Sequence, residues 1–350
     1  RMVIPLFPLL FLPVALSSPF DGLSSIPQLN SLMQDHFARV DSLSMEEFKR
    51  RLPSPSEQKS MRQLITLLLI QKDLRNCVQN TVSSMFPPLK DSIVLSTFLN
   101  KYCIVYEPFP EGKTEMFNRT FGYVAINMPG TDVVPLHHSA AHFESDGRVT
   151  EQAAILFENT NSRTLVNNGM NRFAVEDNPD SSCQPGNTVA DASHNTNLMF
   201  HSMLEGVLEA SRNGVSEHYI QWHGMAQGSC LNSSAFISLG ATGSNAVYDD
   251  TNNVAQKLVS SFISNSNSSM TAHTPRTDGG CSLSASTNVF GRVVHGVPSE
   301  DACLTPATRM DERFIHIEQK EEAREAHAIW TKTLNDVFNT PTYTKDELIR

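Results

Sequence analysis

Histidines and carboxylates gather in one stretch of this 350-residue chain, between Val133 and Glu158. A short apolar run leads there into three histidines and three acids, and a helix is predicted to begin near Thr150. The six side chains are His137, His138, His142, Glu144, Asp146 and Glu151. Neutral imidazole and carboxylate suit a divalent cation such as zinc, which at catalytic sites takes three protein ligands and keeps one position open. The stretch therefore predicts one half of a metal site.

The sequence predicts a third ligand at His223, which ends the apolar strand YIQWH and precedes Gly224. Sites in α/β sheets form where strands end, and glycine lets the chain turn away sharply. The alternative for His223 is a core histidine whose hydrogen bonds are satisfied. Glu318 lies in the apolar strand FIHIEQ, where a carboxylate is costly to bury unless it is paired or functional. It is the candidate general base, and an edge-strand acid facing solvent is the alternative.

Strand and helix patterns alternate through residues 114–345, which predicts an α/β domain with a mixed β-sheet and helices on both faces. The predicted strands are 121–128, 133–138, 164–170, 218–226, 236–242, 289–296 and 313–319, and the predicted helices after the one near Thr150 are 195–212, 254–263 and 321–338. Residues 27–106 show a helical period punctuated by prolines. We expect them to form a helical region packed on the main domain.

The beginning of the chain and its cysteines predict a secreted protein. Residues 1–17 form a short apolar stretch that ends in small residues, as a signal peptide does. Six cysteines form an even set, and three sequons at Asn118, Asn232 and Asn267 predict glycosylation. The net charge of −10 and the lack of a basic patch exclude a nucleic-acid partner. We expect no stable membrane insertion.

Four short motifs, PLHHS at 135–139, NRFAVEDN at 171–178, WHG at 222–224 and FIHIE at 314–318, resemble those of N-formylglutamate amidohydrolases and follow the same order. The order is also similar to that of poly-γ-glutamate hydrolases and, more distantly, zinc carboxypeptidases. The resemblance covers about residues 120–340 and implies a zinc carboxypeptidase-like fold. It also implies a zinc ion held by three ligands, with a base that activates a zinc-bound water. Those residues are His138, Glu151 and His223 as ligands and Glu318 as base.

The chain departs from this pattern at two points, which leaves alternatives open. The spacing is not the close His-x-x-Glu of the carboxypeptidases, so Glu144 or Asp146 could take the place of Glu151. His137 and His142 crowd the same segment, and neighbours in a strand point to opposite faces. His137 and His138 should therefore not share one ion, and His138 is preferred because a serine follows it.

Polar residues near the predicted site are candidates to bind a substrate carboxylate. Arg172 and Arg292 match a carboxylate with two parallel hydrogen bonds, and Asn288 lies close to the second arginine. An ion pair with Glu176 or Asp177 is the alternative for Arg172. The segment DASHNTN at 191–197 is expected to cap the helix that follows, and His194 could instead face the cleft.

The six cysteines allow several pairings. A bridge from Cys183 to Cys230 would tie together two loops that carry site residues. The pairs Cys281–Cys303 and Cys77–Cys103 would then close local loops.

Two functions fit these observations. The first is a secreted zinc-dependent hydrolase that cleaves an amide bond in an N-acyl-amino-acid, γ-glutamyl or peptide-type substrate bearing a carboxylate. The second is a catalytically inactive binding module that keeps the fold. The presence of both predicted halves of the metal site and of the base favours the enzyme. The chain has no Gly-x-Ser-x-Gly motif, which weakens a serine-esterase interpretation.

Overall fold

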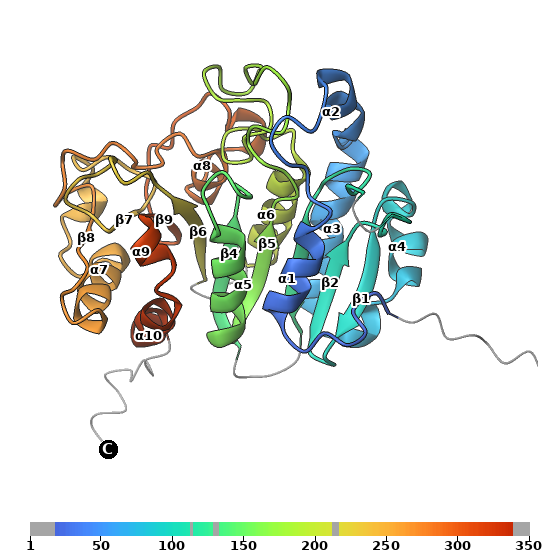
Figure 1. The fold of residues 1–350 in the computed structure, drawn as a ribbon, viewed down its shortest axis with the longest axis horizontal. Helices are drawn as coiled ribbons and strands as arrows, with labels where there is room; N and C mark the ends of the chain where they lie inside the picture. Colours follow the sequence, from blue (N-terminus) through green and yellow to red (C-terminus); the bar gives the residue numbers. More distant parts are fainter. Residues whose placement is uncertain (1–17, 113–114, 129–132, 212–216, 339–350) are drawn as a thin grey trace, which may run out of the picture.

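The computed structural model describes residues 18–112, 115–128, 133–211 and 217–338 (Figure 1). The predicted signal peptide, 1–17, and the last residues of the predicted α/β domain, 339–345, lie outside them. Nine strands form one sheet within the described residues. In spatial order they are β1 (Val94–Phe98), β2 (Tyr102–Tyr106), β3 (Tyr123–Asn127), β5 (Ser162–Asn167), β4 (Val134–Ala140), β6 (His218–Gly224), β9 (Phe314–Gln319), β7 (Ala235–Ser238) and β8 (Ala272–His273).

The sheet is mixed, as predicted. Its centre is the parallel set β5–β4–β6–β9, while β1, β2 and β3 join it by antiparallel pairing and β7 runs antiparallel to β9. Parallel strands need crossover helices, so helices cover the two faces of this part of the sheet. All residues of β3 and β5 are buried.

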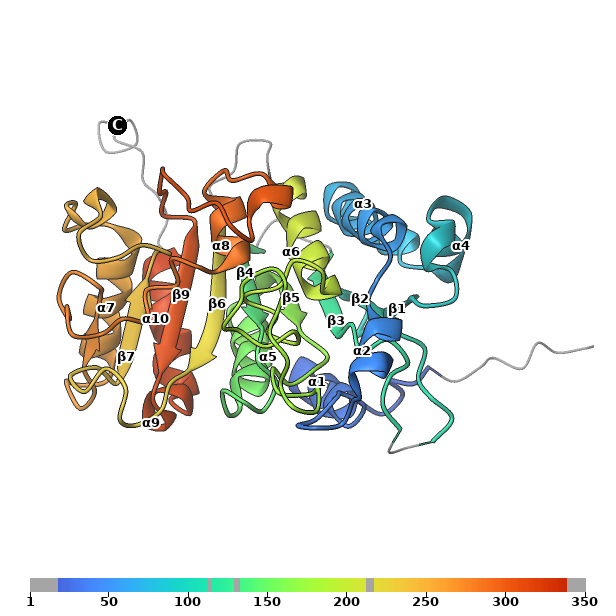
Figure 2. The same cartoon turned by 90° about the horizontal axis from the view of Figure 1, so that it is seen from above.

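Helices cover both faces of the sheet (Figure 2). One buried apolar cluster joins the first face to α1 (Ile26–Gln34), α5 (Val149–Asn159), α7 (Val254–Asn265), α9 (Glu321–Arg324) and α10 (His327–Phe338). A second cluster joins the other face to α2 (Met45–Arg51), α3 (Pro55–Gln71), α4 (Gln79–Met85), α6 (Met199–Ala210) and α8 (Val289–Val294). Short 3-10 turns are η1 (Leu74–Asn76), η2 (Pro87–Leu89), η3 (Ala246–Tyr248) and η4 (Ser299–Asp301).

Three element predictions are wrong. The stretch 289–296 is the helix α8 rather than a strand, because Asn288 caps it and Gly291 lets it pack on the ring of Phe314. The predicted helix 321–338 is interrupted between α9 and α10. The region 27–106 is not wholly helical, since β1 and β2 extend the central sheet.

The disulfides are Cys77–Cys103, Cys183–Cys303 and Cys230–Cys281, so the first predicted pair is confirmed and the other two are wrong. Cys183 precedes the loop residue Gln184, whose amide donates to the carbonyls of Thr287 and Cys303, and this contact brings Cys183 to Cys303. Spacing along the chain does not reveal such a contact. Three bridges fit an extracellular protein. The three sequon asparagines are all exposed.

No helix among the described residues is both long enough and apolar enough to span a bilayer.

Candidate functional site

The ends of three adjacent parallel strands, β4, β6 and β9, bring the candidate residues to one edge of the sheet. His142 follows the end of β4 by two residues, His223 is the next-to-last residue of β6, and Glu318 pairs with His223 across β6 and β9. Gly224 permits the approach of the loop after β4, because a Cβ there would lie 2.2 Å from the carbonyl oxygen of Asp146. The need for glycine after His223 is therefore steric.

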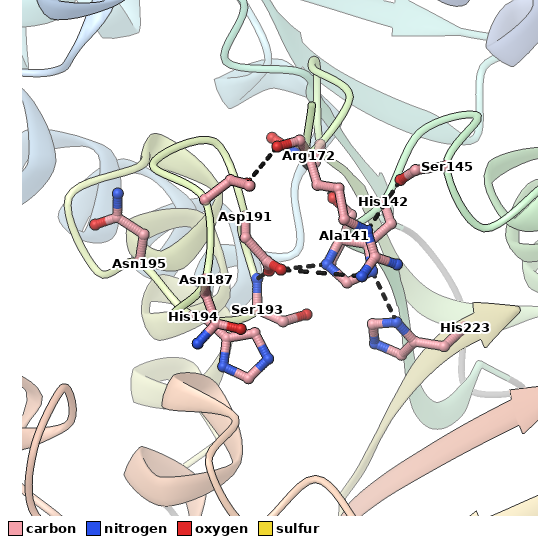
Figure 3. Close-up of polar contacts among 12 residues, drawn as sticks. Ala141, His142, Ser145, Arg172, Asn187, Asp191, Ser193, His194, Asn195 and His223 are labelled. Atoms are coloured by element: carbon pink, nitrogen blue, oxygen red, sulfur yellow. Dashed lines mark hydrogen bonds and ion pairs between the residues drawn. The ribbon is translucent and has the colours of Figure 1, made fainter. Parts of the chain in front are cut away.

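The long loop between β5 and α6 supplies Arg172 and Asp191. Figure 3 shows Asp191 turned toward His142, with Arg172 beside them and His223 below. The Arg172 guanidinium pairs with Asp146, and its Nε donates to Ser145 Oγ at 3.2 Å. The two aspartates and one arginine leave a net negative charge in a buried place, which suits a cation.

Three ligand atoms converge at the centre of the site. His142 Nδ1 lies 2.9 Å from Asp146 Oδ2, and His223 Nδ1 lies 3.0 Å from the same oxygen. The two Nδ1 atoms are 3.1 Å apart. All three side chains are buried.

His142 reaches this centre with its Nδ1 atom. Its Nε2 lies 2.9 Å from Asp191 Oδ1 and its Nδ1 lies 2.9 Å from Asp146 Oδ2, so each ring nitrogen meets a carboxylate. A metal at Nδ1 requires the tautomer in which Nε2 carries the proton and donates to Asp191. Burial opposes ionisation of Asp191, but its contacts with His142 lower the pKa of the carboxyl below the usual range. Burial, followed by the charge of Arg172, lowers the pKa of His142, and the ring is neutral near pH 7. In that tautomer the unprotonated Nδ1 faces Asp146.

His223 does the same from the other side. Its Nε2 lies 2.9 Å from Gln221 Oε1 and donates to it. Burial, followed by the proximity of His142, holds the pKa of His223 well below its usual value. Its Nδ1 is therefore also a lone pair directed at the centre.

With both histidines protonated on Nε2, two imidazole lone pairs and a carboxylate oxygen face one another, and a cation among them relieves their repulsion. A tetrahedral zinc with bonds of about 2.05 Å separates its ligand atoms by roughly 3.3 Å, close to the separations here. Asp191 and Gln221 hold the outer nitrogens of the two histidines, the usual arrangement around ligating histidines. The set His142, Asp146 and His223 thus fits a divalent cation.

Glu318 lies beside this set. A second group of potential ligands consists of His223, His316 and Glu318, with ligand atoms within 4.8 Å of one another. The closest approach in it that involves the carboxylate, from His316 Nε2 to Glu318 Oε1, is 3.6 Å, too long for a hydrogen bond. Burial raises the pKa of Glu318 to about 7, against the lowering effect of His142 and Arg172. A carboxyl that titrates near neutral pH suits proton transfer.

The structure does not bring His138 and Glu151 to His223, which corrects the predicted ligand set. His138 pairs in register with Ile220, so it shares the face of Ile220 and Trp222, opposite to that of His223. Trp222 Nε1 donates to His138 Nδ1 at 3.0 Å, and His138 Nε2 lies 3.0 Å from Ser162 Oγ. Both nitrogens are satisfied.

Glu151 lies on α5, which covers that same opposite face. It accepts a hydrogen bond from Thr150 and lies 3.7 Å from Arg148. The second-choice residues His142 and Asp146 take the places of His138 and Glu151.

The remaining second-choice residues have other partners. His137 lies between Thr164 and Glu217, stacked on Tyr219. Glu144 pairs with Arg39. His194 Nδ1 lies 2.7 Å from Gln184 Oε1.

Of the predicted carboxylate-binding residues, Arg172 lies in the site and pairs there with Asp146 instead of Glu176 or Asp177. Arg292 does not face the site freely, because its guanidinium donates to the carbonyls of Ser286, Ala302 and Cys303. Asn288 caps α8 and donates to Gln221. The predicted substrate role of Arg292 is therefore withdrawn.

Sequence reasoning missed three residues of the site. Asp191 was expected to cap a helix, but α6 begins without a side-chain cap. Gln221 precedes His223 by two residues on the same face, a spacing that period-two reasoning would have found. Arg324 has no signal in the sequence; its guanidinium lies against Gly147 and Gly224, and its buried Nε has no hydrogen-bond partner among the described residues.

Comparisons with known proteins give one weak structural likeness. No family model matches the chain, and no curated protein matches it significantly. One solved structure that resembles it is the N-formylglutamate amidohydrolase of Ralstonia eutropha JMP134, at 12% identity and a TM-score of 0.34. The match covers 61% of this chain and 94% of that protein. A likeness this weak carries no argument about function, so the case for function is made from the site alone.

Proposed function

We propose that this chain is a secreted, zinc-dependent hydrolase that cleaves an amide bond in a substrate bearing a carboxylate, such as an N-acyl amino acid or a γ-glutamyl peptide. The observation that carries the proposal is the convergence of three potential ligand atoms, from His142, Asp146 and His223, beside a carboxyl with a raised pKa. Three protein ligands leave one position for water or substrate. This pattern serves metal-assisted hydrolysis.

When bound, the zinc ion would polarise the substrate carbonyl and lower the pKa of a water molecule. The protein's own residues do the rest. Glu318, 13% exposed at its side chain, takes a proton from the attacking water and returns it to the leaving nitrogen. Asp191 and Gln221 keep the histidine protons on the outer nitrogens. Arg172 offsets part of the negative charge of the two aspartates.

Arg324 is the residue we assign to the substrate carboxylate. Among the described residues it has no salt-bridge partner, and its guanidinium lies beside the loop that carries Asp146 and beside Gly224. An arginine binds a carboxylate through two parallel hydrogen bonds, and an unpaired guanidinium next to the site offers them. A substrate with a carboxylate near its scissile amide fits this arrangement.

The test is metal analysis followed by a substrate screen. Purified protein, stripped with a chelator and reloaded, should hold about one zinc per chain. The reloaded protein should hydrolyse at least one member of a panel of N-acyl amino acids and γ-glutamyl peptides, and the stripped protein should not. A chain that binds zinc and cleaves no amide in the panel would be a binding module.

A further inference from the structure

The tautomer of His223 depends on the Gln221 amide, which sits beside it on the same face of β6. A carbonyl oxygen at that place makes His223 Nε2 the donor and leaves Nδ1 bare. An amide nitrogen there would make Nε2 the acceptor and move the proton to Nδ1, toward Asp146. The two orientations have opposite consequences for a cation, and the neighbours of Gln221 decide between them.

Asn288 settles the choice through its place at the start of α8. Its Oδ1 accepts from the backbone N–H of Gly291 at 2.9 Å, as a helix cap requires. A backbone N–H can only donate, so the other end of the Asn288 side chain is the nitrogen. That nitrogen lies 2.5 Å from the Gln221 side chain, which must present its oxygen in return.

The same Gln221 oxygen gathers further donors. Ser193 Oγ lies 3.1 Å from it and His223 Nε2 lies 2.9 Å from it. The Gln221 nitrogen is buried without a hydrogen-bond partner among the described residues. A buried, unpaired N–H group is unfavourable, so the orientation is not the best one for Gln221 alone. It is the one that Asn288 imposes.

We propose that Asn288 is a positioning residue that acts through Gln221 to hold the proton of His223 on Nε2, so that Nδ1 is free to bind the metal. The inference rests on the proposed function for the role of the metal. The tautomer itself is a property of the metal-free protein. The contacts run from Asn288 to Gln221 and from Gln221 to His223. The donor in the first contact is fixed by the helix cap, and the donor in the second is fixed by the first.

The decisive variant is Asn288→Asp. Aspartate caps helices as well as asparagine, so α8 is preserved. Its second oxygen then faces Gln221 and accepts, which turns the Gln221 amide around and places N–H against His223 Nε2. The His223 proton should move to Nδ1, and the affinity for zinc should fall about 10–100-fold, the usual effect of losing an outer hydrogen-bond partner.

Three companions separate this effect from a general disturbance. Asn253→Asp makes the same change at the cap of α7, away from the site, and should leave the zinc affinity unchanged. Asn288→Ser keeps a cap but offers no obligatory acceptor to Gln221, so its loss should be smaller. Gln221→Glu presents oxygen in either orientation, so His223 should keep its proton on Nε2.

Two measurements decide the outcome. Long-range ¹H–¹⁵N spectra of metal-free protein with labelled histidine report which nitrogen of His223 is protonated, and competition with a chelator gives the zinc affinity. A wild-type His223 protonated on Nδ1 overturns the proposal, and so does equal zinc affinity in Asn288→Asp and Asn288→Ser. If the wild type binds no zinc, the proposed function fails, while the spectra still confirm or refute the control of the tautomer by Asn288.

Discussion

Two pairs of buried histidines in this chain differ in one respect that decides their roles. His137 and His138 lie within β4, where each ring nitrogen meets a partner that complements it. His142 and His223 lie at strand ends, where each outer nitrogen is satisfied and each inner nitrogen faces another acceptor. Burial alone therefore does not mark a ligand. A lone pair left without a donor does.

The largest expected effect comes from removing one histidine of the second pair, His142 and His223. His142→Ala removes one of three ligands and should leave no zinc on the protein after desalting, while Glu151→Gln should keep a full complement. Metal analysis of the two purified variants checks this. Retention of zinc by His142→Ala together with its loss from Glu151→Gln would restore the ligand set predicted from the sequence.

Glu318→Gln separates catalysis from metal binding. The amide has almost the same size but cannot accept a proton, so zinc should stay bound while kcat falls about 10²–10⁴-fold. Steady-state kinetics and metal analysis on one preparation give both quantities. Loss of zinc in this variant would place Glu318 in the second group of ligands, with His223 and His316.

Arg324→Met tests the assignment of the substrate carboxylate. Loss of a hydrogen-bonded charge pair costs about 1.5–3 kcal/mol, so KM should rise about 10–150-fold for a substrate with the carboxylate. The KM of an analogue with a neutral amide in its place should hardly change. Arg148→Met, an exposed arginine on the neighbouring loop, is the matched control. Equal KM values in the two variants would remove Arg324 from the site.

His138→Leu tests whether the first pair, His137 and His138, stabilises the fold without binding metal. It leaves the Trp222 N–H without its acceptor, and the free energy of unfolding should fall by about 1–3 kcal/mol while zinc binding persists. Urea denaturation of the metal-free variants measures the loss. In the double variant with Trp222→Phe the loss should be less than additive, because the donor is gone as well. Additive losses would mean that the hydrogen bond contributes nothing.

The strands at the site follow from their apolar runs, and strand-end reasoning reaches His223 and Glu318. The choice between His138 and His142 does not follow, because it depends on the register of β4 against β6, which sets the face of each side chain. A strand pattern predicts alternation but not which partner residue lies opposite. His142 escapes this constraint because it lies beyond the end of β4.

The prediction of a strand at 289–296, where the structure has α8, is wrong for a different reason. Its β-branched sequence favours a strand, and the contacts of Asn288 and Gly291 with distant residues override that preference. The contacts at Nε2 of His142 and His223 also depend on the folded chain. Asp191 reaches His142 from 49 positions away, a pairing that only the folded chain displays.

The smallest expected effect is a shift in the pH dependence of the rate. It tests whether a cation bound at His142 and His223 lowers the pKa of Glu318. The rate requires ionised Glu318, so kcat/KM should rise with pH through the pKa of this carboxyl in the free enzyme. Burial raises that pKa to about 7 in the metal-free protein. A bound divalent cation favours the carboxylate and lowers it. The acid limb measured under saturating zinc should therefore lie below pH 7.

Titration of Glu318 should also affect the stability of the metal-free protein. The rate rises with pH, whereas the contribution of Glu318 to the free energy of unfolding falls. A carboxyl whose pKa is raised on folding binds more protons in the native state between its unfolded pKa, about 4.5, and about 7. The contribution of Glu318 to the free energy of unfolding should consequently fall as pH rises through that window, and Glu318→Gln should remove this slope. Urea titrations at pH 5.5 and 7.5 on wild type and variant measure it. An unchanged slope in the variant would show that Glu318 titrates at its ordinary pKa, and Glu318 would then lack the near-neutral pKa that suits a group which both takes up and returns a proton.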